Sequence, residues 1–180
     1  MFLKNWYKAL TAEMYNHESV TGKNTSGNNI RFTKTSASAG IYALTTLTLA
    51  GGTSLTNYNT VPYMGLVQTS YNYGGVVFGT GDTAPNPDDY KLSGSVITKI
   101  SASGSVSVTQ DDDGCTFTGV YTITNTDSAD IVVKEVGLLM KGAYSGVFLI
   151  ERTVLDEPIT IPADGVGQIT YTIRMNYPTA

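Results

Sequence analysis

The chain has 180 residues, a length that suits one domain or one domain with an appended arm. Charged residues make up only 14% of it, against roughly 25% in an average globular chain, and the formal net charge is -4. An acidic chain lacks the cationic face that nucleic-acid binding requires, so no nucleic-acid partner is expected. Thr, Ser, Asn and Gly supply the polarity instead, which indicates a β protein whose surface is partly covered by neighbouring subunits.

The chain has a single cysteine, Cys115, which excludes an intrachain disulfide and favours assembly in a reducing cytoplasm. Residues 1–6 contain neither an uninterrupted apolar stretch nor a small-residue cleavage site, so no signal peptide is expected. No window reaches the roughly 20 apolar residues that a membrane span requires. We therefore expect a protein that is made in a cytoplasm and has no membrane partner.

Residues 1–62 are predicted to form an N-terminal helix followed by an extended arm. Large apolar residues recur at helical spacing within residues 2–16. This stripe consists of Phe2, Leu3, Trp6, Tyr7, Leu10 and Met14. A helix of about fifteen residues is marginal alone and needs a surface, either its own domain or another subunit. Residues 18–62 are polar and contain two short β-like pieces, at 30–35 and 41–49, so we expect partner chains to order this arm.

From residue 63 onward, strand-like runs alternate with turn signals, which predicts a mainly β domain over residues 63–180. Turns are expected at residues 101–104, 111–114 and 142–146, among others. Strands are expected at residues 63–68, 75–79, 93–101, 105–109, 115–125, 131–140, 147–155, 159–161 and 166–177. This spacing predicts an antiparallel β-sandwich of immunoglobulin-like or jelly-roll type.

One hairpin can be placed in register from the sequence. Symmetric pairing about residues 142–146 sets Leu139 opposite Phe148 and Glu135 opposite Arg152, with all four on one face. That face is otherwise apolar. Glu135 and Arg152 are therefore expected to form a structural ion pair within the core or at its margin.

Candidate catalytic and metal-binding residues are few. His17 is the only histidine and Cys115 the only cysteine, so a histidine triad, a zinc site and thiol catalysis are not expected. The acidic residues 111–113 lack the remaining ligands of a calcium loop and, followed by Gly114, are interpreted as a hairpin turn. We predict no catalytic residue, no metal and no cofactor, and the chain is not expected to be an enzyme.

Tyrosines gather in a segment rich in Gly, Asn and Ser, a setting typical of contact surfaces. These are Tyr58, Tyr63, Tyr71 and Tyr73. Together with the apolar stripe they are our candidate interface residues. The alternative is that their rings form a sugar-binding platform.

Several segments resemble one group of proteins. Residues 79–92 read GTGDTAPNPDDYKL, close to the pattern GTGxTxPxxxDYxL, and residues 133–138 read VKEVGL, close to [IV]KEVGL. The likeness continues with RTVL at 152–155, PITIP at 158–162 and ITYTI at 169–173. Taken in this order, the segments cover about residues 75–176 and resemble poorly characterised structural proteins of tailed bacteriophages and prophages.

The resemblance implies a non-enzymatic virion component, such as a tail, neck, baseplate or capsid-decorating protein. Such a protein is made in the host cytoplasm, ends in the virion, and has copies of itself and other virion proteins as partners. The alternative function is a carbohydrate-binding or adhesive β-sandwich module on a virion or cell surface, with a surface glycan as its ligand.

Overall fold

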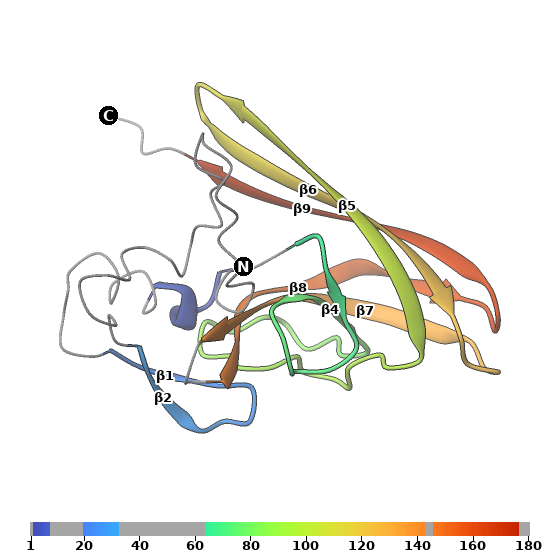
Figure 1. Ribbon diagram of the computed structural model, residues 1–180, viewed down its shortest axis with the longest axis horizontal. Helices are drawn as coiled ribbons and strands as arrows, with labels where there is room; N and C mark the ends of the chain where they lie inside the picture. Colours follow the sequence, from blue (N-terminus) through green and yellow to red (C-terminus); the bar gives the residue numbers. More distant parts are fainter. Residues whose placement is uncertain (1, 8–19, 33–63, 143–145, 177–180) are drawn as a thin grey trace, which may run out of the picture.

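The computed structural model describes residues 2–7, 20–32, 64–142 and 146–176. Within these residues the protein is mainly β (Figure 1). Helical backbone is assigned at residues 4–7, and none of the described helical backbone is long and apolar enough to cross a bilayer. Several predicted features lie outside the described residues, namely the strand at 41–49 together with Leu10, Met14, His17, Tyr58 and Tyr63.

The described strands form two larger sheets and one small hairpin. A four-stranded sheet has the order β3-β4-β7-β8, a three-stranded sheet has the order β5-β6-β9, and β1 pairs with β2. The strands are β1 (Val20–Lys23), β2 (Asn29–Phe32), β3 (Val67–Gln68), β4 (Gly75–Gly79), β5 (Ile100–Asp111), β6 (Gly114–Asn125), β7 (Ile131–Gly142), β8 (Gly146–Ile161) and β9 (Val166–Asn176).

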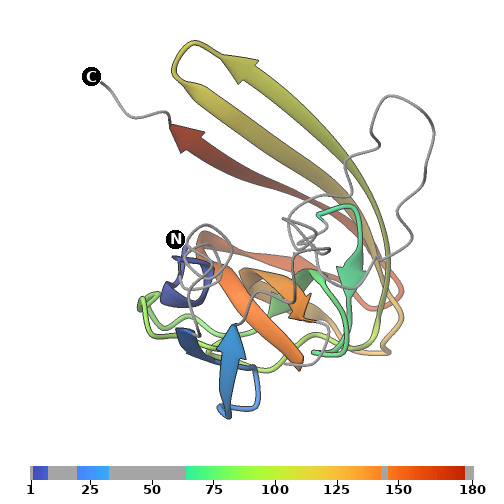
Figure 2. The ribbon, with the colours of Figure 1, turned by 60° about the vertical axis from the view of Figure 1, so that its left-hand side comes forward.

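The two larger sheets face each other across the main core, consistent with the predicted β-sandwich (Figures 1 and 2). Their facing residues alternate along each strand, as a pleated surface requires. The four-stranded sheet contributes Val76, Phe78, Val136, Leu138, Met140, Phe148 and Ile150, and the three-stranded sheet contributes Tyr121, Ile123, Ile169, Tyr171 and Ile173. Phe78 and Tyr121 meet edge to face, with ring centroids 5.8 Å apart.

The opposite face of the four-stranded sheet is also buried. A second apolar cluster lies there, made of Leu3, Val77, Leu92, Leu139, Val147 and Leu149. The strand β4 is buried along its whole length, which explains its uninterrupted sequence GVVFG. The segment between β4 and β5 supplies Leu92 to this cluster, so a connection rather than a third sheet covers the outer face.

The predicted turn at residues 101–104 is wrong, because β5 runs without interruption from Ile100 to Asp111 and pairs with β6 in one register. Gly104 lies opposite Tyr121, and a Cβ at Gly104 would come within 2.6 Å of the Tyr121 ring. This glycine therefore makes room for a core tyrosine and does not turn the chain.

Other boundaries also differ from the predictions. Residues 93–99 form no strand, although Val96 makes an isolated bridge to Gly79. The predicted pieces at 147–155 and 159–161 belong to one strand, β8. The strand β3 is only two residues long and runs parallel to β4.

The predicted hairpin register is wrong in its detail. Leu139 pairs with Leu149, and Phe148 therefore lies on the inter-sheet face while Leu139 lies on the outer face. A one-residue slip moves every side chain to the other face of a sheet. A β-bulge between Leu138 and Leu139 then adds one further residue, so that Glu135 pairs with Val154. The two offsets return Glu135 and Arg152 to one face as diagonal neighbours.

Candidate functional site

The candidate site lies on the outer face of the four-stranded sheet, where the segment after β4 crosses β7. Two glycines make this crossing close. A Cβ at Gly79 or at Gly137 would come within 2.6 or 2.8 Å of Leu92, respectively. Gly79 and Gly137 thus leave space for the Leu92 side chain, so that segments far apart in sequence pack together here.

Glu135 projects from β7 under this segment and has no exposed surface. One carboxylate oxygen, Oε1, accepts hydrogen bonds from the main-chain amides of Gly81 at 2.9 Å and Gly94 at 2.8 Å. The other, Oε2, accepts from the Ser93 amide at 3.1 Å. The carboxylate therefore satisfies main-chain donors of a segment that has no sheet partner for them.

Arg152 projects from β8 and closes the same site from the other side, with 1% of its surface exposed. Its Nε donates to Glu135 Oε2 at 2.7 Å. Its Nη1 donates to Asp89 Oδ2 at 2.7 Å, and its Nη2 donates to the Thr83 carbonyl and to Ser93 Oγ, both at 2.6 Å. The guanidinium thus binds groups at three positions of the segment between β4 and β5, which we call the loop.

We call this set the Glu135–Arg152 clamp; it comprises the side chains of Glu135, Arg152, Asp89 and Ser93 and the main-chain groups of Gly81, Thr83 and Gly94. Burial opposes ionisation of Glu135, but the amides of Gly94 and Ser93 and the guanidinium of Arg152 outweigh it, so its pKa lies below the usual value. Burial likewise opposes the charge of Arg152, but Glu135 and Asp89 outweigh it and raise its pKa. Both groups are charged at neutral pH.

Further hydrogen bonds and ion pairs also hold the loop in place. Tyr71 Oη accepts a hydrogen bond from the Leu92 amide at 3.0 Å. At the surface, Lys134 pairs with Asp82 and Lys4 with Asp88, each at 2.8 Å. These exposed pairs contribute less than the buried clamp, because water screens them.

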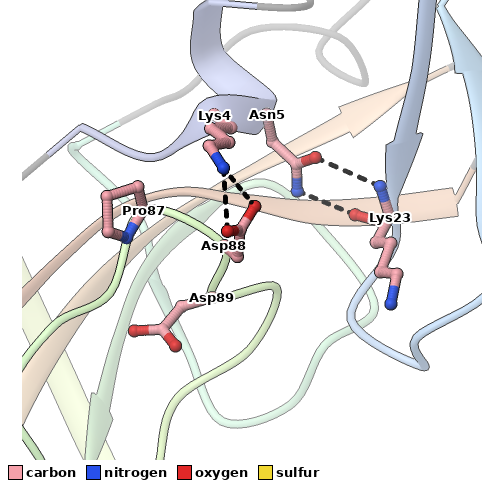
Figure 3. Close-up of a pocket in the computed structure, with 6 residues that line it drawn as sticks. All are labelled: Lys4, Asn5, Lys23, Pro87, Asp88 and Asp89. Atoms are coloured by element: carbon pink, nitrogen blue, oxygen red, sulfur yellow. Dashed lines mark hydrogen bonds and ion pairs between the residues drawn. The ribbon is translucent and has the colours of Figure 1, made fainter.

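A small polar pocket lies where the loop meets the N-terminal residues (Figure 3). Its lining consists of Lys4, Asn5, Lys23, Pro87, Asp88 and Asp89. Within it, Lys4 Nζ bonds both oxygens of Asp88, and the Asn5 side chain bonds the main chain of Lys23 in both directions, at 2.8 and 3.1 Å. These contacts join the N-terminal residues, β1 and the loop into one unit.

The described members of the predicted interface divide into buried and exposed residues. Leu3 is fully buried in the second cluster, and Phe2 and Trp6 stack at 5.6 Å and pack against the main core. Tyr7 and Tyr73 are 58% and 55% exposed. The interface role assigned to these residues stays a prediction, as does the boundary between residues 1–62 and 63–180. Leu3, however, has no surface left for a partner while it holds this position.

The predicted ion pair between Glu135 and Arg152 is present, although the two residues do not face each other directly. Sequence reasoning missed Asp89, Ser93 and Thr83 as members of the clamp. The DYxL pattern singles out Asp89, but no local signal connects it with Arg152, which lies 63 positions away.

At the tip of the β5–β6 hairpin, Asp111 acts as a turn residue. Its Oδ1 accepts hydrogen bonds from the amides of Asp113 at 3.0 Å and Gly114 at 2.8 Å, and its carboxylate pairs with Arg174 at 3.0 Å. Among the described residues, no three His, Cys, Asp or Glu side chains are arranged to hold a metal ion. The prediction that no metal is bound remains a prediction.

We expect Glu135 and Glu151 to give opposite pH dependences of stability. Burial raises the pKa of Glu151, whereas that of Glu135 is lowered. A lowered pKa adds stability that is lost as pH falls below about 4.3, and a raised pKa adds stability that is lost as pH rises above about 4.3. Glu135→Gln should therefore reduce the loss of stability as pH falls below about 4.3. Glu151→Gln should reduce the loss of stability as pH rises above about 4.3.

The measurement is the urea midpoint of each variant from pH 3 to pH 7. Wild-type protein and Asp156→Asn, which alters an exposed carboxylate on β8, are the references. If both glutamine variants changed the same side of the profile, the assignment of the two carboxylates to opposite environments would be wrong.

Comparisons of the chain with protein-family models, with curated proteins and with solved structures gave no match.

Proposed function

We propose that the chain is a non-enzymatic structural protein of a tailed bacteriophage particle and that it acts through subunit assembly. The observation that carries the proposal is the Glu135–Arg152 clamp, because three of the segments behind the resemblance, 79–92, 133–138 and 152–155, contribute residues to it. GTG supplies Gly81, DYKL supplies Asp89 and KEVGL supplies Glu135, while Gly79 and Leu92 pack beside the clamp. The patterned residues thus have a common physical task, which is to fix a long loop on a sheet.

The chemistry of the clamp favours a structural task over catalysis. Glu135 and Arg152 are buried and bind protein groups at 2.6 to 3.3 Å, so a substrate would have to displace bonds that hold the loop. Burying an ion pair costs desolvation energy, which close contacts between the charged groups offset. The best-attested role of such a pair is to hold the chain in one arrangement. A loop held in one shape suits a subunit that must fit identical neighbours.

The proposal includes the finer predictions from the sequence. These are an immunoglobulin-like or jelly-roll type of sandwich, an N-terminal helix, and location in the virion as a tail, neck, baseplate or capsid-decorating part. Copies of the chain and other virion proteins are the proposed partners. The described surface offers little to the glycan alternative, since Tyr71 uses its hydroxyl to hold Leu92 and only Tyr73 of the pair is mostly exposed.

The test is the oligomeric state of the full-length chain. We expect sedimentation velocity to show species larger than a monomer that increase with protein concentration. A glycan array with the same preparation is the control. A monomer at every concentration that binds one glycan class specifically would contradict the proposal and support the adhesive module.

A further inference from the structure

The three-stranded sheet extends beyond the sheet that covers it. In Figures 1 and 2 the β5–β6 hairpin and the end of β9 stand clear of the four-stranded sheet. Near the base, the inward residues Tyr121 and Ile169 are 0% and 2% exposed. Toward the tip, the inward residues Val106, Val108 and Met175 are 39%, 56% and 38% exposed. The core-facing surface therefore continues into an apolar patch that the described residues leave open.

One edge of this sheet is formed by β5, which is twelve residues long. Among the described residues no strand pairs with its outer edge. The strand has no proline, no bulge and no charged residue before Asp111 at its end. Monomeric proteins normally protect a long edge with such devices, because an open edge pairs with other chains.

The four-stranded sheet differs, because described residues cover one of its edge strands. Its edge strand β8 is covered by the N-terminal residues: the Leu3 amide bonds the Ile150 carbonyl at 2.9 Å, and the Asn5 side chain reaches the Leu149 carbonyl at 3.4 Å. The Thr25 amide bonds the Val147 carbonyl at 3.0 Å. Described residues thus cover β8, whereas none of the described strands pairs with the outer edge of β5.

We propose that β5 pairs with β5 of a second copy, antiparallel about a two-fold axis at Ser107, which joins two three-stranded sheets into one. This deepens the proposed function and rests on it, since it names the surface through which copies assemble. Residues directly opposite in an antiparallel pair share a face, so a continuous sheet must pair inward with inward positions. Centring the pair on Ser107 sets Val106 opposite Val108 of the second copy, twice.

A two-fold axis at either neighbouring residue of β5 gives a poorer match between opposed side chains. An axis at Val106 would set Val108 opposite Gly104, and an axis at Val108 would set Val106 opposite Gln110. With the axis at Ser107, the charge of Asp111 faces Ser103 of the second copy and no like charges meet. The uncovered tip of one copy then lies beside the covered base of the other. There β3 packs against β5, and the neighbouring Leu66 is 48% exposed.

The first test is a cross-link at the axis. Ser107→Cys is made together with Cys115→Ser, so that the chain has one thiol. Opposed residues of an antiparallel pair have Cα atoms about 4.5–5.5 Å apart, within the range of a disulfide. Mild oxidation of the full-length protein should then give a covalent dimer. Thr172→Cys in the same background, on the opposite edge strand β9, is the control and should stay uncross-linked.

The second test separates this inference from the proposed function. Val108→Lys should weaken self-association at least tenfold, while Thr172→Lys should not, and both side chains are exposed so the monomer should fold. If wild type assembles but Ser107→Cys does not cross-link and Val108→Lys assembles normally, the β5 pairing is wrong and assembly stands. If wild type never assembles, both fail. If the β5 amides resist hydrogen exchange as strongly in the dilute monomer as in the assembled protein, a segment of the same chain occupies the edge and the pairing is again wrong.

Discussion

Arg152→Ala is expected to lower the free energy of unfolding by about 3–5 kcal/mol, because it leaves Glu135 charged and buried without its partner. The loss extends beyond one ion pair. The same guanidinium binds Asp89, the Thr83 carbonyl and Ser93 Oγ, so its removal also leaves loop groups unsatisfied. We therefore expect the loop after β4 to lose its fixed shape before the sandwich unfolds.

The measurement is equilibrium urea unfolding followed by circular dichroism, with amide exchange of Gly81 and Gly94 as the local readout. Arg174→Ala is the matched control, since it makes the same chemical change at a surface pair with Asp111 and should alter stability little. Equal destabilisation by the two variants would mean that the buried clamp contributes no more than a surface ion pair.

A double variant distinguishes the ion pair from the loop contacts. Replacing both members of a buried pair by apolar residues is often neutral. Here Glu135→Leu with Arg152→Met should remain destabilised, because Glu135 also accepts from the amides of Gly81, Gly94 and Ser93. Full recovery of stability in the double variant would show that the carboxylate's bonds to the loop are dispensable.

The sequence predicted the parts of the fold that alternation specifies. The strands β6 and β7 begin and end close to their predicted limits, because their inward apolar residues recur with a period of two. The closeness of Glu135 and Arg152 was predicted from symmetric pairing about residues 142–146, and it holds because the one-residue offset and the bulge together shift the pairing by two positions. Their exact pairing was not predicted, since a bulge is set by packing on both faces and has no periodic signal.

One error arose at a glycine. Gly104 was taken as a turn residue because local rules associate glycine in a serine-rich run with turns. Its actual task, making room for the Tyr121 ring, depends on a residue in another strand. The loop after β4 was missed as a site for a related reason. Its amides bond to Glu135, which lies 41 to 54 positions away, and no local pattern encodes such a distance.

Leu3→Ala is expected to lower the free energy of unfolding by about 2–5 kcal/mol, the usual cost of truncating a fully buried leucine. Leu3 packs in the cluster on the outer face of the four-stranded sheet, and its amide bonds the Ile150 carbonyl of β8. The cavity would open next to Leu92, so the loop and the N-terminal residues should loosen together. Urea unfolding at low protein concentration measures the effect.

Leu66→Ala is the matched control for this variant, because it removes the same atoms from a side chain that is 48% exposed and should cost much less. The comparison decides how the N-terminal residues should be understood. A large loss for Leu3→Ala makes these residues part of the domain's own core, which leaves the remainder of residues 1–62 and the β5 edge to meet other subunits. Unchanged stability together with weaker self-association would instead assign Leu3 to contacts between chains, as the apolar stripe of the sequence first indicated.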